Sequence, residues 1–176
     1  EKPGRRFFKI SERDFSSIVF DTQELETYVQ HIKRAKWTKF SWKGLTLMKD
    51  PMTMTIYLQL IQELKPKSIL EFGTFDGGSA LWMSDMIKSL GLNCDIHTFD
   101  INSERVNLPR LENVTFHELD NFKIRKFSQS NSEFLSSLEH PILAIEDSHN
   151  NVMELLICID DYLRPGDYLI IEDTLD

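Results

Sequence analysis

The chain has 176 residues, of which 41% are hydrophobic and 27% are charged, and its formal net charge is -8. This length and composition favour one folded domain with its own core and exclude a fibrous or disordered chain. The acidic excess argues against a surface that neutralises nucleic-acid phosphates. We therefore expect a small-molecule substrate and no nucleic-acid partner.

The cysteines and the apolar runs indicate a cytoplasmic protein. Cys94 and Cys158 lie in apolar segments without C-x-x-C spacing, as expected of buried free thiols in a reducing compartment. No apolar run reaches the ~18 residues of a membrane span, and the first ten residues lack the apolar stretch of a secretion signal. We expect no membrane partner, and a homo-oligomer is compatible with the sequence.

Two helices are predicted before the glycine-rich centre of the chain. Asp21 and Glu24 have the spacing of a capping box, and an apolar stripe follows at Leu25, Tyr28, Val29 and Ile32. A second helix is predicted between Pro51 and Pro66, with a buried face formed by Ile56, Leu60, Ile61 and Leu64. We expect residues 1–50 to form an amino-terminal helical extension or lid, and residues 51–176 to form the main domain.

From Ser68 onward, short apolar runs alternate with helical segments. The predicted strands are "SILEF", "CDIHTF", "VTFHEL", "ILAIED" and "DYLIIED", and the predicted helices cover 78–90, 131–138 and 150–163. This alternation predicts an α/β fold, a Rossmann-like, doubly wound and mostly parallel sheet. The carboxyl ends of its strands then share one edge, where ligands bind in such sheets.

The loop "EFGTFDGGSA" follows the first of these strands and matches neither of two common nucleotide motifs. A dinucleotide site needs G-x-G-x-x-G, but Phe75 stands where the second glycine is required. A triphosphate site needs Lys and then Ser or Thr after the last glycine, and Ser79 and Ala80 stand there instead.

A third interpretation is a site for an amino-acid group that carries both of its charges. Glu71 would accept hydrogen bonds from an ammonium, and Gly73 and Gly77 would let the chain turn around it. Gly78 and Ser79, at the start of the next helix, would hold a carboxylate. S-adenosylmethionine (SAM) carries both groups. The alternative is a tight turn without a ligand.

Two further acidic residues are candidate cofactor ligands. Asp100 ends the second strand and could bind both hydroxyls of a ribose, although an Asp there is also a common turn starter. Asp120 ends the third strand and could reach an adenine amino group, or could be an ordinary loop residue.

Two long segments carry a resemblance to a known family. "KDPMTMTIYLQLIQELKPKSILEFGTFDGGSALWM" and "IEDSHNNVMELLICIDDYLRPGDYLIIEDT" resemble the cephalosporin hydroxylase and rhamnosyl O-methyltransferase group of class I SAM-dependent methyltransferases. The resemblance implies seven strands, the last two forming an antiparallel hairpin. No segment after Asp176 supplies them, so we expect a carboxyl-terminally incomplete domain. The "DSHNN" turn is also shorter than the family's D-S-x-H segment.

Three carboxylates are predicted at the same edge of the sheet. Asp147 ends the fourth strand, and Glu172 and Asp173 end the fifth. Like charges this close need a cation or a retained proton, and oxygen ligands suit Mg²⁺ or another hard divalent cation. The resemblance implies a metal on these three residues. The alternative is that they cap the helices that follow.

The predicted function is that of a SAM-dependent, divalent-metal-assisted O-methyltransferase that acts on a small-molecule hydroxyl. His149 is the candidate general base beside Asp147, or else a surface histidine. Two alternatives stay open, an NAD(P)-linked oxidoreductase or hydroxylase and a non-catalytic SAM-binding module. The sequence leaves the methyl acceptor unassigned.

Overall fold

The computed structural model of the protein describes residues 41–49 and 51–172. All of them belong to one compact unit that spans residues 37–176. The helix predicted after Asp21 and the extension up to residue 40 lie outside the described residues, so both remain predictions.

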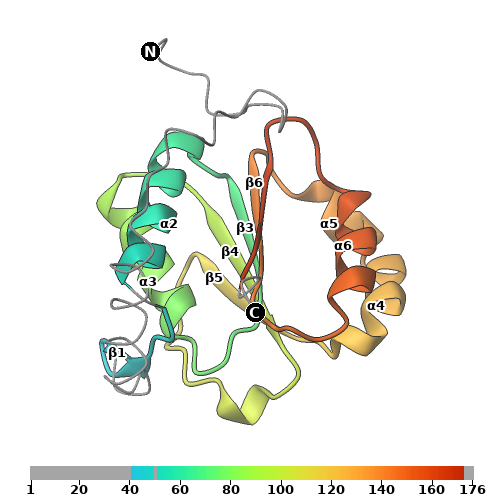
Figure 1. The fold of residues 1–176 in the computed structure, drawn as a ribbon, viewed down its shortest axis with the longest axis horizontal. Coiled ribbons are helices and arrows are strands. Elements are labelled where there is room, and N and C mark those ends of the chain that lie inside the picture. Colours follow the sequence, from blue (N-terminus) through green and yellow to red (C-terminus); the bar gives the residue numbers. More distant parts are fainter. Residues whose placement is uncertain (1–40, 50, 173–176) are drawn as a thin grey trace, which may run out of the picture. The chain divides into compact units, whose positions relative to one another are not determined.

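Five parallel strands form the central sheet, as predicted (Figure 1). They are β3 (Ser68–Phe72), β4 (Asp95–Asp100), β5 (Val114–Glu118), β6 (Ile142–Glu146) and β7 (Tyr168–Ile171). Their order is β5-β4-β3-β6-β7. The chain adds β4 and β5 on one side of β3 and then crosses to β6 on the other side. The reversal between β3 and β6 is therefore the expected position of a ligand crevice.

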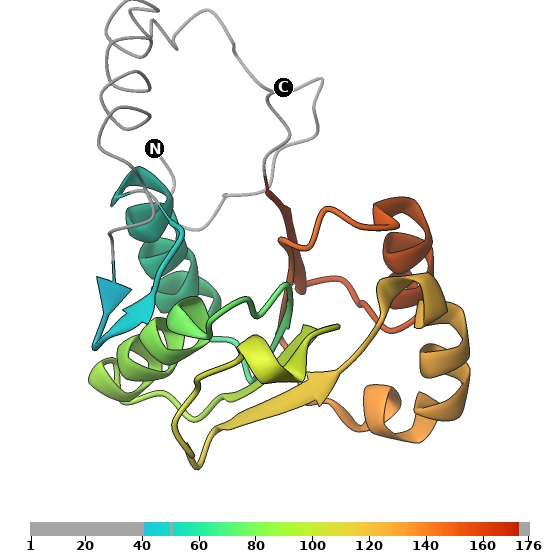
Figure 2. The ribbon, with the colours of Figure 1, turned by 90° about the horizontal axis from the view of Figure 1, so that it is seen from below.

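Helices cover both faces of the sheet (Figures 1 and 2). One layer contains α2 (Pro51–Leu64) and α3 (Gly78–Ser89), and the other contains α4 (Ile124–Ser130), α5 (Ser132–Ser137) and α6 (Val152–Asp160). Short 3-10 helices occur at η4 (Ser103–Arg105) and η5 (Asn121–Lys123). Within the described ranges, no helix combines the length and apolar character needed to cross a bilayer.

The helix predicted over 131–138 is confirmed as α5, but the prediction missed α4, which directly precedes it. Seven residues of α4 give too few turns for an apolar period to stand out in the sequence. Ile124 nevertheless anchors α4, because it is fully buried against the sheet.

A two-stranded antiparallel ribbon that the sequence did not predict precedes α2. It consists of β1 (Ser41–Trp42) and β2 (Leu45–Thr46). The Trp42 Nε1 atom donates to Asp85 Oδ2 of α3 at 2.7 Å, and Lys43 forms an ion pair with the same carboxylate at 2.8 Å. Leu47, just after the ribbon, is fully buried in the core. These contacts fix residues 41–47 on the sheet domain.

The buried face of α2 is shifted by one residue from the prediction. Leu60 and Ile61 are buried as expected, but Ile56 is 55% exposed and Tyr57 is buried instead. Tyr57 lies three, four and seven residues before Leu60, Ile61 and Leu64, which is the spacing of one helix face. Its hydroxyl group donates to the Glu172 carboxylate at the edge of the sheet. The rotation of α2 therefore both buries the Tyr57 ring and brings its hydroxyl group to Glu172, a distant residue in the sequence.

Alanine substitutions distinguish the two faces of α2. Ile61→Ala should lower the free energy of unfolding by about 2–5 kcal/mol, because it leaves a cavity in the core. Ile56→Ala, on the exposed side, should change it by less than about 0.5 kcal/mol. Urea unfolding followed by circular dichroism measures both, and similar losses would contradict the observed face.

Two histidines lie side by side on neighbouring strands, His97 on β4 and His117 on β5. His97 Nδ1 lies 3.1 Å from His117 Nε2, and the His117 ring stacks on Phe99 at a centroid distance of 4.7 Å. Burial lowers the pKa of both, and His97 helps to lower that of His117 to about 4. Both rings are therefore neutral in the folded protein near pH 7.

This pair should make stability fall in mild acid. Below the ordinary histidine pKa of 6.5, His117 binds a proton in the unfolded chain. In the folded protein it stays neutral until the pH falls to about 4, so the unfolded state gains stability over this range. His117→Phe keeps a stacked ring and removes that proton uptake. Between pH 7 and 5, the unfolding free energy should fall more steeply for the original chain than for the variant. Parallel profiles would refute the effect.

Candidate functional site

The glycine loop after β3 turns through left-handed conformations against the loop after β6. Gly73 has φ 115 and Gly77 has φ 96. A Cβ atom on Gly73 would lie 2.5 Å from the carbonyl oxygen of Asp147. Glycine is therefore required at residue 73 by both conformation and space. The loop after β3 and the loop after β6 meet at the predicted crevice.

Glu71 lies beneath this loop and is fully buried. Its Oε2 atom accepts a hydrogen bond from Thr98 Oγ1 at 2.7 Å, while Oε1 has no partner among the described residues. Burial raises the pKa of Glu71 to about 7, although the charge of Lys49 and the hydroxyl groups of Ser79 and Thr98 oppose that rise. A buried carboxylate with an unused oxygen suits a cationic ligand.

The amino end of α3 lies beside the same loop. Gly77 is the N-cap residue, and Gly78 and Ser79 form the first turn and are buried. No side chain in the described part of the chain caps this helix. Its first backbone N–H groups are therefore available to an anion.

The two predicted nucleoside ligands lie in different settings. Asp100 Oδ2 accepts a hydrogen bond from the Phe75 N–H at 2.8 Å, and its Oδ1 accepts one from Asn102. Asp100 therefore lies at the glycine loop, where it also holds a turn. Asp120 instead caps η5 through the Phe122 N–H at 3.0 Å and forms an ion pair with Lys123.

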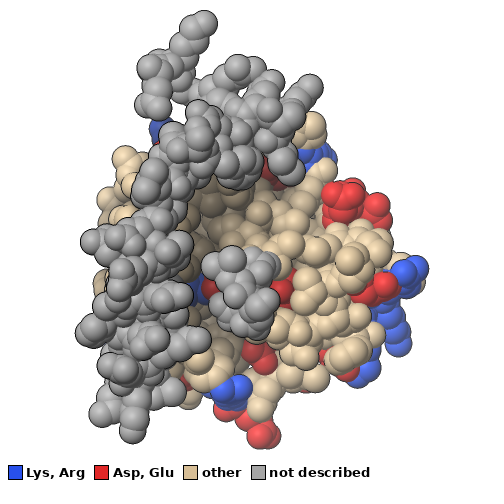
Figure 3. Space-filling view, in the orientation of Figure 1, with Lys and Arg blue, Asp and Glu red and all other residues tan. Residues whose placement is uncertain are grey.

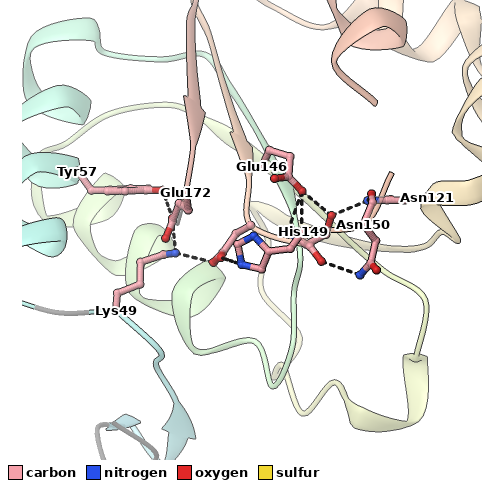
Figure 4. Close-up of polar contacts among 9 residues, drawn as sticks. Lys49, Tyr57, Asn121, Glu146, His149, Asn150 and Glu172 are labelled. Carbon is pink, nitrogen blue, oxygen red and sulfur yellow. Dashed lines mark hydrogen bonds and ion pairs between the residues drawn. The ribbon is translucent and has the colours of Figure 1, made fainter. Parts of the chain in front are cut away.

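Asp147 and Glu172 converge, as the strand ends predict, but a lysine lies between them (Figure 4). The ammonium group of Lys49 is 2.7 Å from Asp147 Oδ2 and 2.5 Å from Glu172 Oε1. Tyr57 donates its hydroxyl hydrogen bond to the same oxygen of Glu172. The Lys49 side chain is only 2% exposed. The two carboxylates thus already share a positive charge.

The pKa shifts reflect this arrangement. Burial alone would lower the pKa of Lys49, but the charges of Asp147, Glu172 and Glu71 outweigh it and raise the pKa. Burial and the Glu172 charge raise the pKa of Tyr57. Burial also holds the pKa of Asp147 above its ordinary value, with Lys49 opposing and Glu172 adding to the rise. Lys49 is therefore cationic at neutral pH.

The loop after β6 is fixed by a carboxylate that the sequence analysis did not select. Glu146 is buried, and its Oε1 accepts hydrogen bonds from the Ser148 N–H and hydroxyl and from the His149 N–H. Asn121 donates to Ser148 Oγ at 2.6 Å (Figure 4). The loop can therefore present His149 in a left-handed conformation with φ 56. His149 Nε2 lies 3.4 Å from Asp147 Oδ1, and its side chain is 48% exposed.

The donor set fits a cation. Asp147 and Glu172 direct carboxylate oxygens at one point, where the ammonium of Lys49 stands in for a positive ion. Among residues 41–49 and 51–172, no three His, Cys, Asp or Glu side chains form a group that could hold a metal ion. The third predicted ligand, Asp173, lies outside those ranges. The three-carboxylate site therefore stays a prediction.

Charge is mixed on the face shown in Figure 3. Uncharged atoms fill most of the middle of its described part, and the charged side chains, of both signs, lie mainly toward the right and lower edges. The acidic groups of the candidate site are instead Glu71, Glu146, Asp147 and Glu172, at the ends of the strands.

Sequence reasoning missed four residues of this site: Lys49, Tyr57, Asn121 and Glu146. Lys49, Tyr57 and Asn121 act through partners distant in sequence, such as Asp147, which lies 98 positions after Lys49. Glu146 acts on the loop that directly follows it. One signal pointed to Lys49. Several buried carboxylates at one sheet edge require a counter-charge, and a lysine that follows the apolar run "LTLM" could supply it.

Comparison with solved structures shows that the chain has the fold of SAM-dependent methyltransferases. Two solved CmcI structures, one apo and one with Mg and SAM, superpose with TM-scores of 0.68 and 0.69 at 33% and 34% identity. Each match covers 79% of this chain and 59% of CmcI. The predicted Rossmann-like fold of class I methyltransferases is confirmed.

The sequence comparisons give the family. The family model for Rhamnosyl O-methyltransferase/CmcI matches residues 34–175. Rhamnosyl O-methyltransferases of Mycobacterium tuberculosis and Mycobacterium leprae are 29% and 25% identical, over 78% of this chain. The chain belongs to the Rhamnosyl O-methyltransferase/CmcI family, as the resemblance implied. It spans 58% of the length of the M. tuberculosis relative and 62% of the M. leprae one.

Substitution of Gly73 tests the contact between the two loops. Gly73→Ala should destabilise the protein more than Gly91→Ala does, because the new methyl group collides with the Asp147 backbone. Gly91 also has positive φ, at 64, but open space around it, so its substitution should cost only about 1–2 kcal/mol. Urea unfolding compares the two variants. Equal losses would mean that the backbone conformation alone, without the collision, requires glycine at residue 73.

Proposed function

We propose that this chain forms the SAM-binding part of an O-methyltransferase that acts on a small-molecule hydroxyl with the help of a divalent cation. The observation that carries the proposal is Glu71, fully buried below an uncapped helix end with one carboxylate oxygen unused. Membership in the Rhamnosyl O-methyltransferase/CmcI family and the likeness to a CmcI structure with Mg and SAM support it.

The proposed cofactor contacts follow the two charges of an amino acid. Glu71 accepts from the ammonium, and the backbone at Gly78 and Ser79 donates to the carboxylate. The positive φ angles of Gly73 and Gly77 let the loop turn tightly around the ligand. Asp100 binds the ribose hydroxyl groups with the lone pairs that Phe75 and Asn102 leave free. Asp120 is the proposed partner of the adenine amino group.

Asp147, Glu172 and Asp173 are the proposed ligands of Mg²⁺ or another divalent cation. A cation held there would lower the pKa of an acceptor hydroxyl and orient it. His149 would take the proton from that hydroxyl, and Asp147 would orient its ring through the Nε2 contact. When bound, SAM supplies a methyl group on a positively charged sulfur. The residues of this chain would hold that group and the acceptor hydroxyl close together and take up the hydroxyl proton.

The two alternatives differ in their support. No comparison supports an NAD(P)-linked enzyme, and Phe75 places its ring against the Arg105 guanidinium, 3.5 Å from the ring centroid, in the loop that a dinucleotide would need. A non-catalytic SAM-binding module shares every cofactor contact with the proposed enzyme. Only methyl transfer separates these two.

Calorimetric titration at pH 8 tests the cofactor site, since Glu71 is ionised above a pKa of about 7. The protein should bind SAM and S-adenosylhomocysteine but not NAD. Glu71→Gln should weaken SAM binding about tenfold or more, because a hydrogen bond to a charged group contributes about 1.5–3 kcal/mol. The affinity of the original chain should fall as the pH is lowered below 7, and that of the variant should change less.

Glu139→Gln is the matched control, because Glu139 is exposed and precedes β6 at the opposite end of the sheet. Equal SAM affinity for both variants, or stabilisation by NAD alone, would refute the cofactor assignment. A panel of hydroxylated small molecules with labelled SAM and Mg²⁺ then tests catalysis. SAM binding without transfer to any of them would favour the non-catalytic module.

A further inference from the structure

Lys49 occupies the position that a metal ion would be expected to take. Its ammonium bridges one oxygen of Asp147 and one of Glu172, at 2.7 and 2.5 Å. Its side chain is 2% exposed, and the Tyr57 ring lies 5.3 Å from it. Lysine is rarely buried to this degree unless acidic groups balance its charge. The contact is therefore an electrostatic requirement of the carboxylate pair.

The surrounding charges are unequal. Two carboxylates contact Lys49 directly, and the buried Glu71 acts on it at longer range. One ammonium balances only part of that negative charge, so the site still attracts a second or a stronger cation. A divalent cation would be drawn to the same oxygens, and Lys49 would repel it or have to leave them.

We propose that Lys49 is the resident counter-cation of Asp147 and Glu172 and competes with a divalent cation for them. This rests on the proposed function only in taking that pair as metal ligands. Lys49 stabilises the pair without a metal, and cation entry moves its ammonium away from at least one of the two carboxylates. Lys49 thereby sets the cation concentration at which the site loads.

A fixed structural ion pair predicts something different. If Lys49 only held Asp147 and Glu172 in place, its loss would disorder them and weaken metal binding. If Lys49 competes, its loss removes a positive charge from the site and strengthens metal binding. The sign of the change in metal affinity therefore decides between the two roles.

The experiment is a calorimetric titration of MgCl₂ into the original chain and into Lys49→Met, which keeps the length of the side chain without its charge. Lys126→Met is the control, because Lys126 is exposed on α4. Lys49→Met should bind Mg²⁺ about tenfold tighter or more, and the control should match the original chain. Without metal, Lys49→Met should melt at a lower temperature, and saturating Mg²⁺ should restore most of the loss.

A second measurement needs no variant. Acetic anhydride labels accessible amines, and mass spectrometry of the peptides gives the labelling rate of each lysine. Mg²⁺ should raise the rate at Lys49 and leave that at Lys126 unchanged. Unchanged protection of Lys49 at saturating Mg²⁺ would overturn the competition, as would equal or weaker Mg²⁺ binding by Lys49→Met.

A parallel SAM titration separates this inference from the proposed function. If SAM binds while Lys49→Met leaves the Mg²⁺ affinity unchanged, only the competition fails. If the original chain binds neither SAM nor Mg²⁺, the proposed function fails as well. If neither the original chain nor Lys49→Met binds Mg²⁺, the carboxylate pair is no metal site and the competition is wrong.

Discussion

The carboxyl edge of the sheet depends on one buried ammonium. Glu71, Asp147 and Glu172 all act on Lys49, and they come from three different strand ends. Without that positive charge, burial and mutual repulsion would drive protons onto the carboxylates or pull the strand ends apart. Lys49 belongs to the segment that joins the amino-terminal ribbon to α2. Both the ion pairs of Lys49 and the packing of Leu47 therefore attach this segment to the sheet.

Parallel register explains how residues so distant in sequence meet. Phe72 of β3 pairs with Glu146 of β6, and Glu146 pairs with Ile171 of β7. The residues that follow these three, Gly73, Asp147 and Glu172, therefore lie side by side at the edge of the sheet. Consecutive residues on a strand point to opposite faces. Glu146 turns back to hold the loop after β6, while Asp147 reaches Lys49 on the other side. Two adjacent carboxylates thus take separate tasks.

Local patterns predicted the five strands and the glycine loop, because a short apolar run or a glycine spacing can be recognised from a few consecutive residues. The same reasoning placed Asp147 and Glu172 together through the rule for strand ends. It failed where a distant partner decides the local structure. Tyr57 is buried and Ile56 exposed, and the Tyr57 hydroxyl donates to a carboxylate 115 residues away. The helical period also allowed Tyr57, which lies three, four and seven residues before Leu60, Ile61 and Leu64, but the prediction selected the more apolar Ile56. Asp173 and residues before 41 lie outside the described part of the chain, so those predictions remain as they were.

The glycine loop and the carboxylate pair form one unit. Gly73 lies against the Asp147 carbonyl, so the backbone that would surround a cofactor also fixes the first residue of the proposed cation site. Thr46, three residues before Lys49, donates its N–H to Asp76 of the same loop at 2.6 Å. The segment that supplies the ammonium is therefore attached to the loop that would hold SAM directly through Thr46 and Asp76, and indirectly through Lys49 and Asp147. The proposed cation site and the proposed cofactor loop therefore share Asp147, whose side chain contacts Lys49 while its backbone lies against Gly73.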